Sequence, residues 1–434
     1  MKKIVRDFLI LALLFQLTAL SAQDNYVYFS KTLPAAAYQE MKFRLTAFVR
    51  TEGEEEDAAA RLWVATNKSG EDMKLSTNVD DTAIRTSQWK SFVVEGVIDG
   101  STENIAFGLL LQYNGKFYFD DLVLSVETKK NKWTTLYKND FEGTDTEFIP
   151  GNLPGRSKIN PGYSSTLTAT DKHQGRKSLL ITGKDVPNFG VNSNVGRYAN
   201  VNGIKLYYEV YGSGYPLLVL HGNGGSISGA ASHYPELMKH YKVIAVDTRG
   251  HGKSTDTDAP LTFEQLAADF NSLLDELQLD SVFVWGHSDG AILGLIMAMD
   301  HPKKVKRLLA YGANLQPDST AIYYWAVNAI KKYSTEVKDP KEKKQVILMV
   351  ENPHIPYERL SSIQAPVLVM AGDRDIITAE HTLKIFQHIP KSQLCILPGA
   401  THNGSWEQQK LFHQFLIDFF EKPFSMPDTK EWFK

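Results

Sequence analysis

The sequence contains almost no cysteine and no excess of positive charge. Cys395 is the single cysteine among 434 residues, so an intramolecular disulfide and a thiolate metal site are both excluded. The 47 Lys and Arg residues are balanced by 50 Asp and Glu residues, which gives a net charge of -3. Because this balance creates no basic field, nucleic acid is not an expected partner. The 43% of hydrophobic residues fits a globular protein, and the length predicts two or three domains.

Long hydrophobic runs are also missing, except near the N-terminus. Residues 8–20 form an apolar run that is interrupted by Gln16, preceded by three basic residues and followed by Ser21 and Ala22. This pattern is typical of a secretory signal peptide cleaved near Ala22. A membrane anchor is disfavoured because about 20 apolar residues are needed to span a bilayer. We therefore expect an exported protein, periplasmic or extracellular, with no membrane anchor after cleavage.

Hydrophobic and polar residues alternate with a period of two between residues 23 and 127, which predicts an antiparallel β-sandwich of the jelly-roll type. Asn114-Gly115 is typical of a type I′ hairpin turn between the last two strands, since both residues tolerate positive φ. The expected strands are 41–50, 60–65, 89–97, 105–113 and 116–126.

The last of these strands, FYFDDLVLSVE, resembles the closing strand of galactose-binding-like jelly rolls that serve as carbohydrate-binding modules. The resemblance implies that Trp63, Trp89 and Tyr113 could stack on sugar rings, and the alternative is that they belong to the core. Asp120 and Asp121 could hold a structural calcium or could simply be solvated. A glycan contact through this domain is thus an expectation that depends on the resemblance.

Residues 128–196 are rich in glycine and proline and have few apolar runs. The segment 175–183 looks like the opening of a second jelly roll, but no closing strands follow it. The sequence leaves two interpretations open: extra strands of the first sandwich, or an ordered linker.

From Tyr198 onward, short apolar strands alternate with amphipathic helices such as 262–277. This alternation predicts one α/β domain over 197–424, with a mostly parallel sheet covered on both faces, and a tail over 425–434. The expected strands are 217–220, 243–246, 281–285, 305–311, 367–370 and 393–397.

The motif GHSDG at 286–290 follows one of these strands and opens the predicted helix 291–299. Its glycines permit a tight strand-to-helix turn that presents the hydroxyl of Ser288 above the sheet. In this context the motif predicts that Ser288 is a catalytic nucleophile.

A serine hydroxyl needs a base within hydrogen-bond reach and an acid that orients the base. His402 follows the last predicted strand and is the expected base. Asp375, in the loop after the preceding strand, is the expected acid, whereas Asp373 is closer to the strand and is expected to stabilise the turn. The strand before that offers only Asn314, which carries no charge. The order Ser, Asp, His is the order that this type of sheet requires.

Glycines in the segment HGNGG at 221–225 allow backbone N–H groups to converge near the serine. We expect the oxyanion hole to consist of the amides of Asn223 and Asp289.

With these motifs in place, residues 197–424 resemble an α/β-hydrolase fold enzyme of the esterase type, and DTRGHGKS at 247–254 matches a turn of that family. The serine at position 288 disfavours haloalkane dehalogenase and epoxide hydrolase chemistry, which use aspartate there. The resemblance also implies a short helical cap at about 315–356.

Asp289 is similar to the acid of amino-acid-ester hydrolases of the biphenyl-hydrolase-like group, which pairs with the amino group of the substrate. The resemblance implies a possible selection of cationic substrates by Asp289. The alternative is an ordinary acid in the first turn of a helix, stabilised by the helix dipole.

The sequence therefore predicts an exported serine hydrolase of carboxylic esters with the triad Ser288, His402 and Asp375, and with no cofactor or metal. The expected substrate is a small-molecule or glycan-linked ester. Amidase or aminopeptidase, thioesterase, carbon-carbon hydrolase and perhydrolase chemistry stay open, because one triad serves them all. A glycan-binding protein with an accessory hydrolase domain is the alternative outside enzymology.

Overall fold

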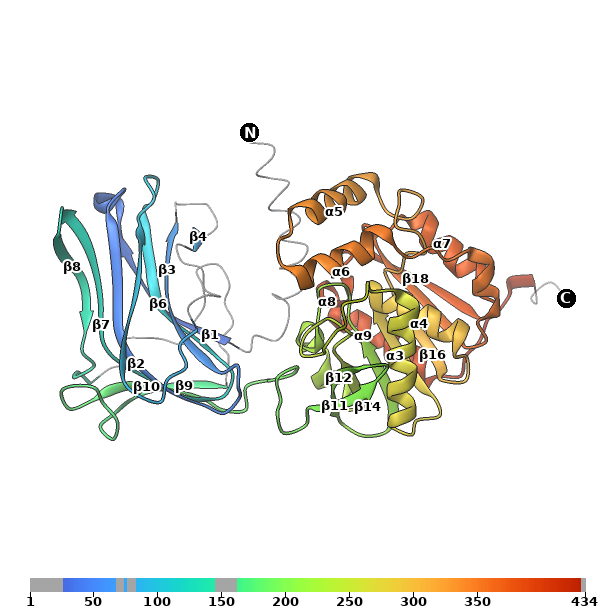
Figure 1. The fold of residues 1–434 in the computed structure, drawn as a ribbon, viewed down its shortest axis with the longest axis horizontal. Helices are drawn as coiled ribbons and strands as arrows, with labels where there is room; N and C mark the ends of the chain where they lie inside the picture. Colours follow the sequence, from blue (N-terminus) through green and yellow to red (C-terminus); the bar gives the residue numbers. More distant parts are fainter. Residues whose placement is uncertain (1–25, 68–73, 76–82, 145–161, 431–434) are drawn as a thin grey trace. The chain divides into compact units, whose positions relative to one another are not determined.

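A computed structural model describes residues 26–67, 74–75, 83–144 and 162–430. The expected signal peptide, residues 1–22, lies outside these residues. The chain contains two compact units, Asp24–Val191 and Asn192–Lys434, and Figure 1 shows the fold of each. None of the described helices is both long enough and apolar enough to cross a membrane.

The first unit consists of two antiparallel sheets. One has the strand order β1-β6-β3-β4 and the other β5-β2-β7-β10-β9, with β8 paired to β7. Alternate residues of β2 are buried, as the period of two predicts, and they pack with those of the facing sheet into one hydrophobic core. The strands are β1 Tyr26–Pro34, β2 Lys42–Gly53, β3 Ala59–Asn67, β4 Lys74–Leu75, β5 Lys90–Val97, β6 Asn104–Gln112, β7 Gly115–Lys129, β8 Lys132–Asn139, β9 Tyr163–Thr168 and β10 Ser178–Gly183.

The expected hairpin at Asn114-Gly115 is wrong. β6 pairs with β1 and β3, whereas β7 pairs with β2 and β10, so this turn carries the chain from one sheet to the other. Asn114 is held there by Glu55, whose carboxylate accepts its backbone N–H at 2.9 Å and its side-chain amide at 2.6 Å. Within the turn, Tyr113 and Gly115 have positive φ. Asn114 itself does not have positive φ, so the predicted type I′ turn does not form either.

The aromatic residues considered for sugar stacking are not a surface platform. Trp63 and Tyr113 are buried, which contradicts their role as stacking residues. Trp89 is half-buried, and its indole N–H donates to Asp171 at 2.8 Å. Asp120 is buried as well, and its carboxylate accepts three backbone N–H groups, from Asp121, His173 and Gln174. This carboxylate therefore anchors a loop.

Part of the segment 128–196 adds strands to the sandwich. β10 and β8 pair with successive stretches of β7, and β9 pairs with β10, so this part of the chain extends one existing sheet. No second jelly roll forms among the described residues of the first unit.

The second unit contains an eight-stranded sheet in the order β11-β12-β14-β13-β15-β16-β17-β18. β11 and β12 are antiparallel additions that the sequence analysis did not identify, and the pairs from β14 to β18 are parallel. The strands are β11 Arg197–Val201, β12 Ile204–Tyr211, β13 Tyr215–Leu220, β14 Tyr241–Val246, β15 Val282–His287, β16 Val305–Tyr311, β17 Val367–Arg374 and β18 Ser392–Thr401.

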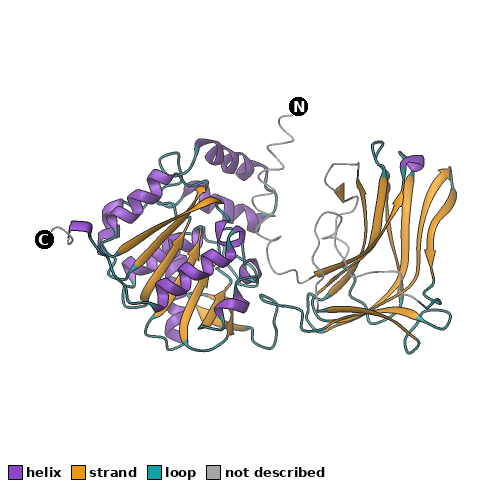
Figure 2. Ribbon diagram, turned by 180° about the vertical axis from the view of Figure 1, so that it is seen from behind, coloured by secondary structure: helices purple, strands orange, loops and turns teal. Residues whose placement is uncertain are grey.

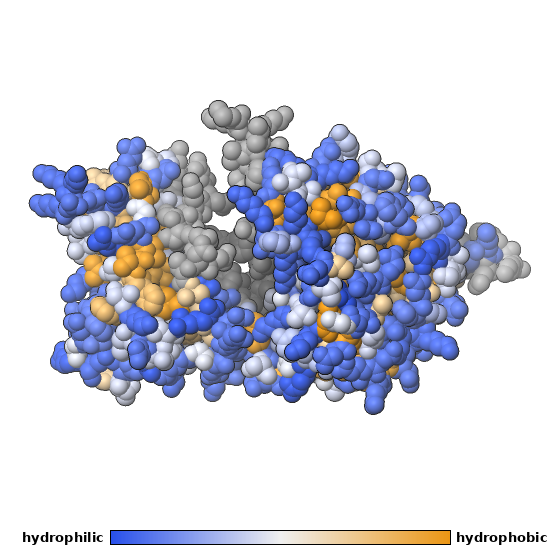
Figure 3. All heavy atoms as spheres, in the orientation of Figure 1, coloured by the Kyte–Doolittle hydropathy of each residue, from blue (hydrophilic) through white to orange (hydrophobic). Residues whose placement is uncertain are grey.

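Helices cover both faces of this sheet (Figure 2). Successive residues of β15 point to opposite faces: Val284 packs in the hydrophobic cluster that includes residues of α3 and α4, while Phe283 stacks on Phe420 of α9 with ring centroids 4.7 Å apart. The surface seen in Figure 3 is mostly hydrophilic over this unit, with separate hydrophobic areas. The helices are α2 Tyr234–Leu237, α3 Phe263–Glu276, α4 Asp289–Asp300, α5 Tyr324–Glu336, α6 Pro340–Glu351, α7 Ala379–His388, α8 Gly404–Glu407 and α9 Gln409–Glu421, with 3-10 turns η1 Ala36–Tyr38 in the first unit and η3 Ile227–Ala230 and η4 Tyr357–Ser362 in this one.

The expected cap region, 315–356, contains α5 and α6. These two helices pack against each other between β16 and β17 in the chain order. The cap is thus a helical hairpin that lies over one end of the sheet (Figure 1).

Candidate active site

Ser288 occupies the sharp turn between β15 and α4. Its backbone has φ 54° and ψ -120°, a strained conformation for a residue with a side chain, and such strain is concentrated at functional sites. The turn needs close backbone packing, since a methyl group at Gly290 would lie 2.1 Å from the carbonyl oxygen of Leu220. The geometry matches the strand, turn and helix that the motif predicts.

The structure brings His402 and Asp375 together. The ring Nδ1–H of His402 donates to Oδ1 of Asp375 at 2.7 Å, and the backbone N–H of Ile377 donates to the same oxygen at 3.0 Å. Burial favours neutral forms of both groups, but their mutual attraction outweighs it, so the pKa of Asp375 is lowered and that of His402 is raised. At neutral pH this arrangement keeps a proton on Nδ1 and leaves Nε2 as the basic nitrogen.

The two residues rejected for the position of the acid, Asp373 and Asn314, make other contacts. Asp373 is exposed and accepts the backbone N–H of Gly399 at 2.8 Å, which is the turn-stabilising contact expected of it. Asn314 donates to the carbonyl oxygen of Gln316. Neither side chain is hydrogen-bonded to His402 within the described residues.

His287 fixes the loop of His402, a role that no pattern in the sequence indicates. Its Nε2–H donates to the carbonyl oxygen of His402 at 2.8 Å. Burial lowers the pKa of His287 to about 3, so the ring is neutral and can donate from only one nitrogen. Next to it, the hydroxyl of Tyr311 donates to the carbonyl oxygen of Thr401 at 3.0 Å. The strand of the nucleophile is thereby tied to the loop of the base.

The loop 221–225 lies directly against Ser288. A methyl group at Gly222 would lie 3.1 Å from Cβ of Ser288, so a side chain at this position would press against the nucleophile. His221 supports the loop, because its Nδ1–H donates to the carbonyl oxygen of Gly222 at 2.7 Å and its Nε2 accepts the N–H of Thr248 at 3.0 Å. Asn223 and Asp289, the expected oxyanion donors, meet through their side chains, with Nδ2 of Asn223 2.9 Å from Oδ2 of Asp289.

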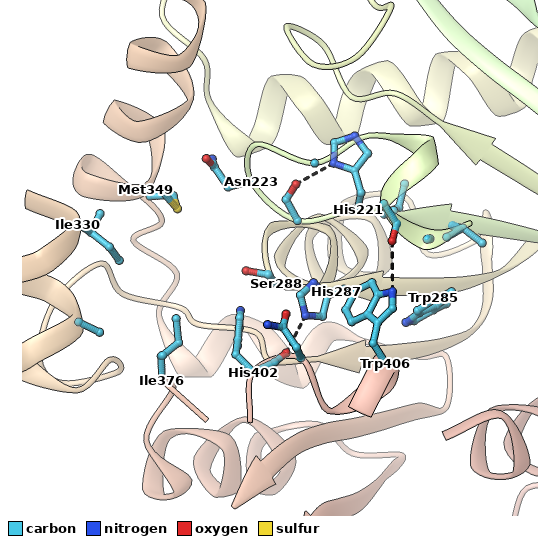
Figure 4. Close-up of a pocket in the computed structure, with 18 residues that line it drawn as sticks. His221, Asn223, Trp285, His287, Ser288, Ile330, Met349, Ile376, His402 and Trp406 are labelled. Carbon is cyan, nitrogen blue, oxygen red and sulfur yellow. Dashed lines mark hydrogen bonds between the residues drawn. The ribbon is translucent and has the colours of Figure 1, made fainter. Parts of the chain in front are cut away.

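A cavity opens on both sides of Ser288 (Figure 4). Together with its open mouth it encloses about 990 Å³. Ile330, Met349 and Ile376 line it on one side, and Trp285 and Trp406 line it on the other. The walls are mainly apolar, and the polar groups are concentrated around Ser288 and His402. In the described part of the chain, no cluster of three or more His, Cys, Asp or Glu side chains could hold a metal ion.

Comparison with known proteins gives the class of the second unit. A family model described as the alpha/beta hydrolase fold matches residues 215–344. The human serine hydrolase BPHL is 29% identical over 260 residues, which cover 54% of this chain and 88% of that protein. The 2-hydroxy-6-oxo-2,4-heptadienoate hydrolase of Pseudomonas putida is 34% identical over 128 residues, 28% of this chain and 46% of that protein. Among solved structures, an enol-lactonase from Burkholderia xenovorans covers 52% of this chain and 100% of its own, with 23% identity and a TM-score of 0.46.

The mostly parallel sheet, the strained serine turn and the family model together define the second unit as an α/β hydrolase fold. The comparisons thus support the fold of an alpha/beta hydrolase for the second unit, and the relatives named above are hydrolases of different kinds.

Proposed function

We propose that this protein is an exported serine hydrolase that cleaves carboxylic esters through an acyl-enzyme. The observation that carries the proposal is that Ser288, in its strained turn, lines the same cavity as His402, whose Nδ1 lies 2.7 Å from Oδ1 of the buried Asp375. The human relative BPHL is a serine hydrolase, which agrees with this chemistry. Export is supported by the pattern of residues 1–22 alone.

In the proposed reaction, Oγ of Ser288 attacks the ester carbonyl carbon while Nε2 of His402 accepts the hydroxyl proton. Asp375 stabilises the imidazolium that forms, and the amides of Asn223 and Asp289 donate to the oxyanion. His402 then returns the proton to the leaving alkoxide. A water molecule then gives a proton to His402 and attacks the acyl-enzyme, and His402 returns the proton to Oγ of Ser288 as the carboxylic acid leaves. Each oxyanion donor contributes about 3 kcal/mol of transition-state stabilisation.

The wild-type protein from Gln23 onward is expected to hydrolyse p-nitrophenyl esters with an optimum of acyl length, because the cavity walls are apolar and of finite size. A fluorophosphonate is expected to stop this turnover by modifying one residue, which peptide mass spectrometry should identify as Ser288. The exposed Ser361, outside the cavity, is the internal control and should stay unmodified. Modification of another residue together with loss of turnover would contradict the assignment of the nucleophile.

The activity is expected to fall as the pH is lowered through a midpoint above 6.5. His402 must be neutral to accept a proton, and its pKa is raised because Asp375 and, more weakly, Asp289 outweigh the effect of burial. Below the midpoint kcat/KM should drop about tenfold per pH unit. Initial rates with an uncharged ester check this, and activity should return on readjustment to neutral pH. A midpoint below 6.5 would mean that the carboxylates do not control His402.

A further inference from the structure

The side chain of Asn223 joins three segments around Ser288. Its Nδ2 donates to Oδ2 of Asp289 at 2.9 Å and to the carbonyl oxygen of Gln345 at 2.9 Å. Asp289 begins α4 directly after the nucleophile, and Gln345 lies in the cap helix α6. The loop that is expected to bind the oxyanion is therefore fixed to the serine turn and to the cap by one amide group.

These two bonds determine the orientation of the amide. If it were turned over, its oxygen would face a carboxylate oxygen and a carbonyl oxygen, both of which are acceptors. In the observed orientation Oδ1 is enclosed and has no hydrogen-bond partner among the described residues. The Asn223 side chain thus uses both of its amide hydrogens while its oxygen stays without a partner. The bonds to Asp289 and Gln345 therefore determine where this side chain lies.

Asp289 is directed toward Asn223 more than toward the cavity. The residue is 7% exposed and is not among those that line the cavity around Ser288. Burial raises the pKa of Asp289 to about 6, against the opposing effects of Asn223 and His402, so the carboxylate is mainly ionised at neutral pH. An ionised acceptor strengthens the hydrogen bond from Asn223. This arrangement differs from the cation-binding role that resemblance to amino-acid-ester hydrolases implies.

The cap end of this connection is also anchored. The side-chain amide of Gln345 donates to the carbonyl oxygen of Gly250 at 2.7 Å, and Lys344 pairs with Asp256. Met349, one turn further along α6, lines the cavity. The carbonyl group that accepts from Asn223 is therefore held in place from the other side.

We infer that Asn223 and Asp289 act through their side chains as positioning residues, in which the Asp289 carboxylate holds the oxyanion loop through Asn223 and does not bind a substrate cation. This inference rests on the proposed ester hydrolysis. The charge of Asp289 then raises the rate of the chemical step for every ester, whatever the charge of the substrate.

The test compares two esters that differ only in an amino group, L-phenylalanine methyl ester and methyl 3-phenylpropanoate. Asp289→Ala and Asn223→Ala are each expected to lower kcat roughly 10- to 100-fold for both esters, with KM within about twofold, because an oxyanion donor is displaced. The double variant should lose no more than the larger single loss, since the two side chains act as one unit. A KM increase confined to the amino ester in Asp289→Ala would overturn the inference, as would losses that multiply in the double variant.

Two further measurements separate positioning from a general loss of structure. Asp289→Asn keeps an acceptor for Asn223 but removes the charge near His402, so its loss of kcat should be smaller and the acid limb of its pH profile should move to lower pH. Glu264→Gln, which removes an exposed first-turn carboxylate from α3, is the matched control and should change neither. An unmoved acid limb in Asp289→Asn would contradict the role of the charge.

If the wild type hydrolyses neither ester, the proposed function fails separately, and the inference is tested on the rate at which a fluorophosphonate modifies Ser288. The phosphoryl oxygen requires the same loop amides, so Asn223→Ala and Asp289→Ala should slow modification by a similar factor. Equal rates in wild type and variants would overturn the inference.

Discussion

Replacing Asp375 with asparagine is expected to lower kcat for ester hydrolysis by on the order of 10⁴-fold. In the native site, Oδ1 of Asp375 accepts the Nδ1–H of His402 at 2.7 Å, which leaves the Nε2 lone pair free to take the serine proton. The amide group of asparagine can donate to Nδ1, and the ring then carries its proton on Nε2. The base is lost although the packing is almost unchanged. Steady-state rates with a p-nitrophenyl ester measure the effect.

Asp373 provides the matched control, since it lies two residues away, near the end of β17. It is exposed, and its contact is with the backbone N–H of Gly399. Asp373→Asn should therefore change kcat by no more than about twofold. Equal losses in the two variants would show that the loop as a whole matters and that Asp375 has no special role as the acid.

Much of the second unit was predictable because its signals are local. The strands from β13 to β18 and the helix α3 coincide with the expected ranges to within a few residues, since apolar runs and amphipathic periods record burial directly. The serine turn was also predictable, because the glycines around Ser288 report a conformation of the same few residues. Asp375 and His402 were paired by their positions after successive parallel strands, which meet at one edge of the sheet.

What could not be predicted depends on residues far apart in the sequence. The contact of His287 with the carbonyl oxygen of His402 joins positions 115 residues apart, and the contact of Asn223 with Asp289 joins positions 66 apart. Neither leaves a periodic pattern. The wrong hairpin at Asn114-Gly115 has the same origin, because turn residues encode local dihedral angles while pairing depends on which sheet each strand joins.

Replacing Arg249 with alanine is expected to destabilise the second unit by about 3–5 kcal/mol, because it leaves a buried charge uncompensated. Arg249 comes from the DTRGHGKS motif and is fully buried, with Nε 2.7 Å and Nη2 2.8 Å from the two carboxylate oxygens of Asp269. Asn202 also donates to Asp269, at 2.9 Å, but a neutral donor does not balance the charge. Urea unfolding followed by tryptophan fluorescence measures the loss of free energy of unfolding. In thermal unfolding, the Tm should fall by roughly 2–4 °C per kcal/mol.

The exposed pair of Arg359 and Asp300 separates burial from ion pairing as the cause. Its N–O distance, 2.6 Å, is as short as that of the buried pair, but the side chains are 41% and 38% exposed. Water solvates both charges there, so Arg359→Ala should cost no more than about 1 kcal/mol. The double variant Arg249→Met/Asp269→Leu should recover most of the stability lost in Arg249→Ala, because it removes the orphaned carboxylate and keeps apolar volume. If the double variant is as unstable as Arg249→Ala, the cause is lost packing around the arginine, and the charge of Asp269 is not responsible.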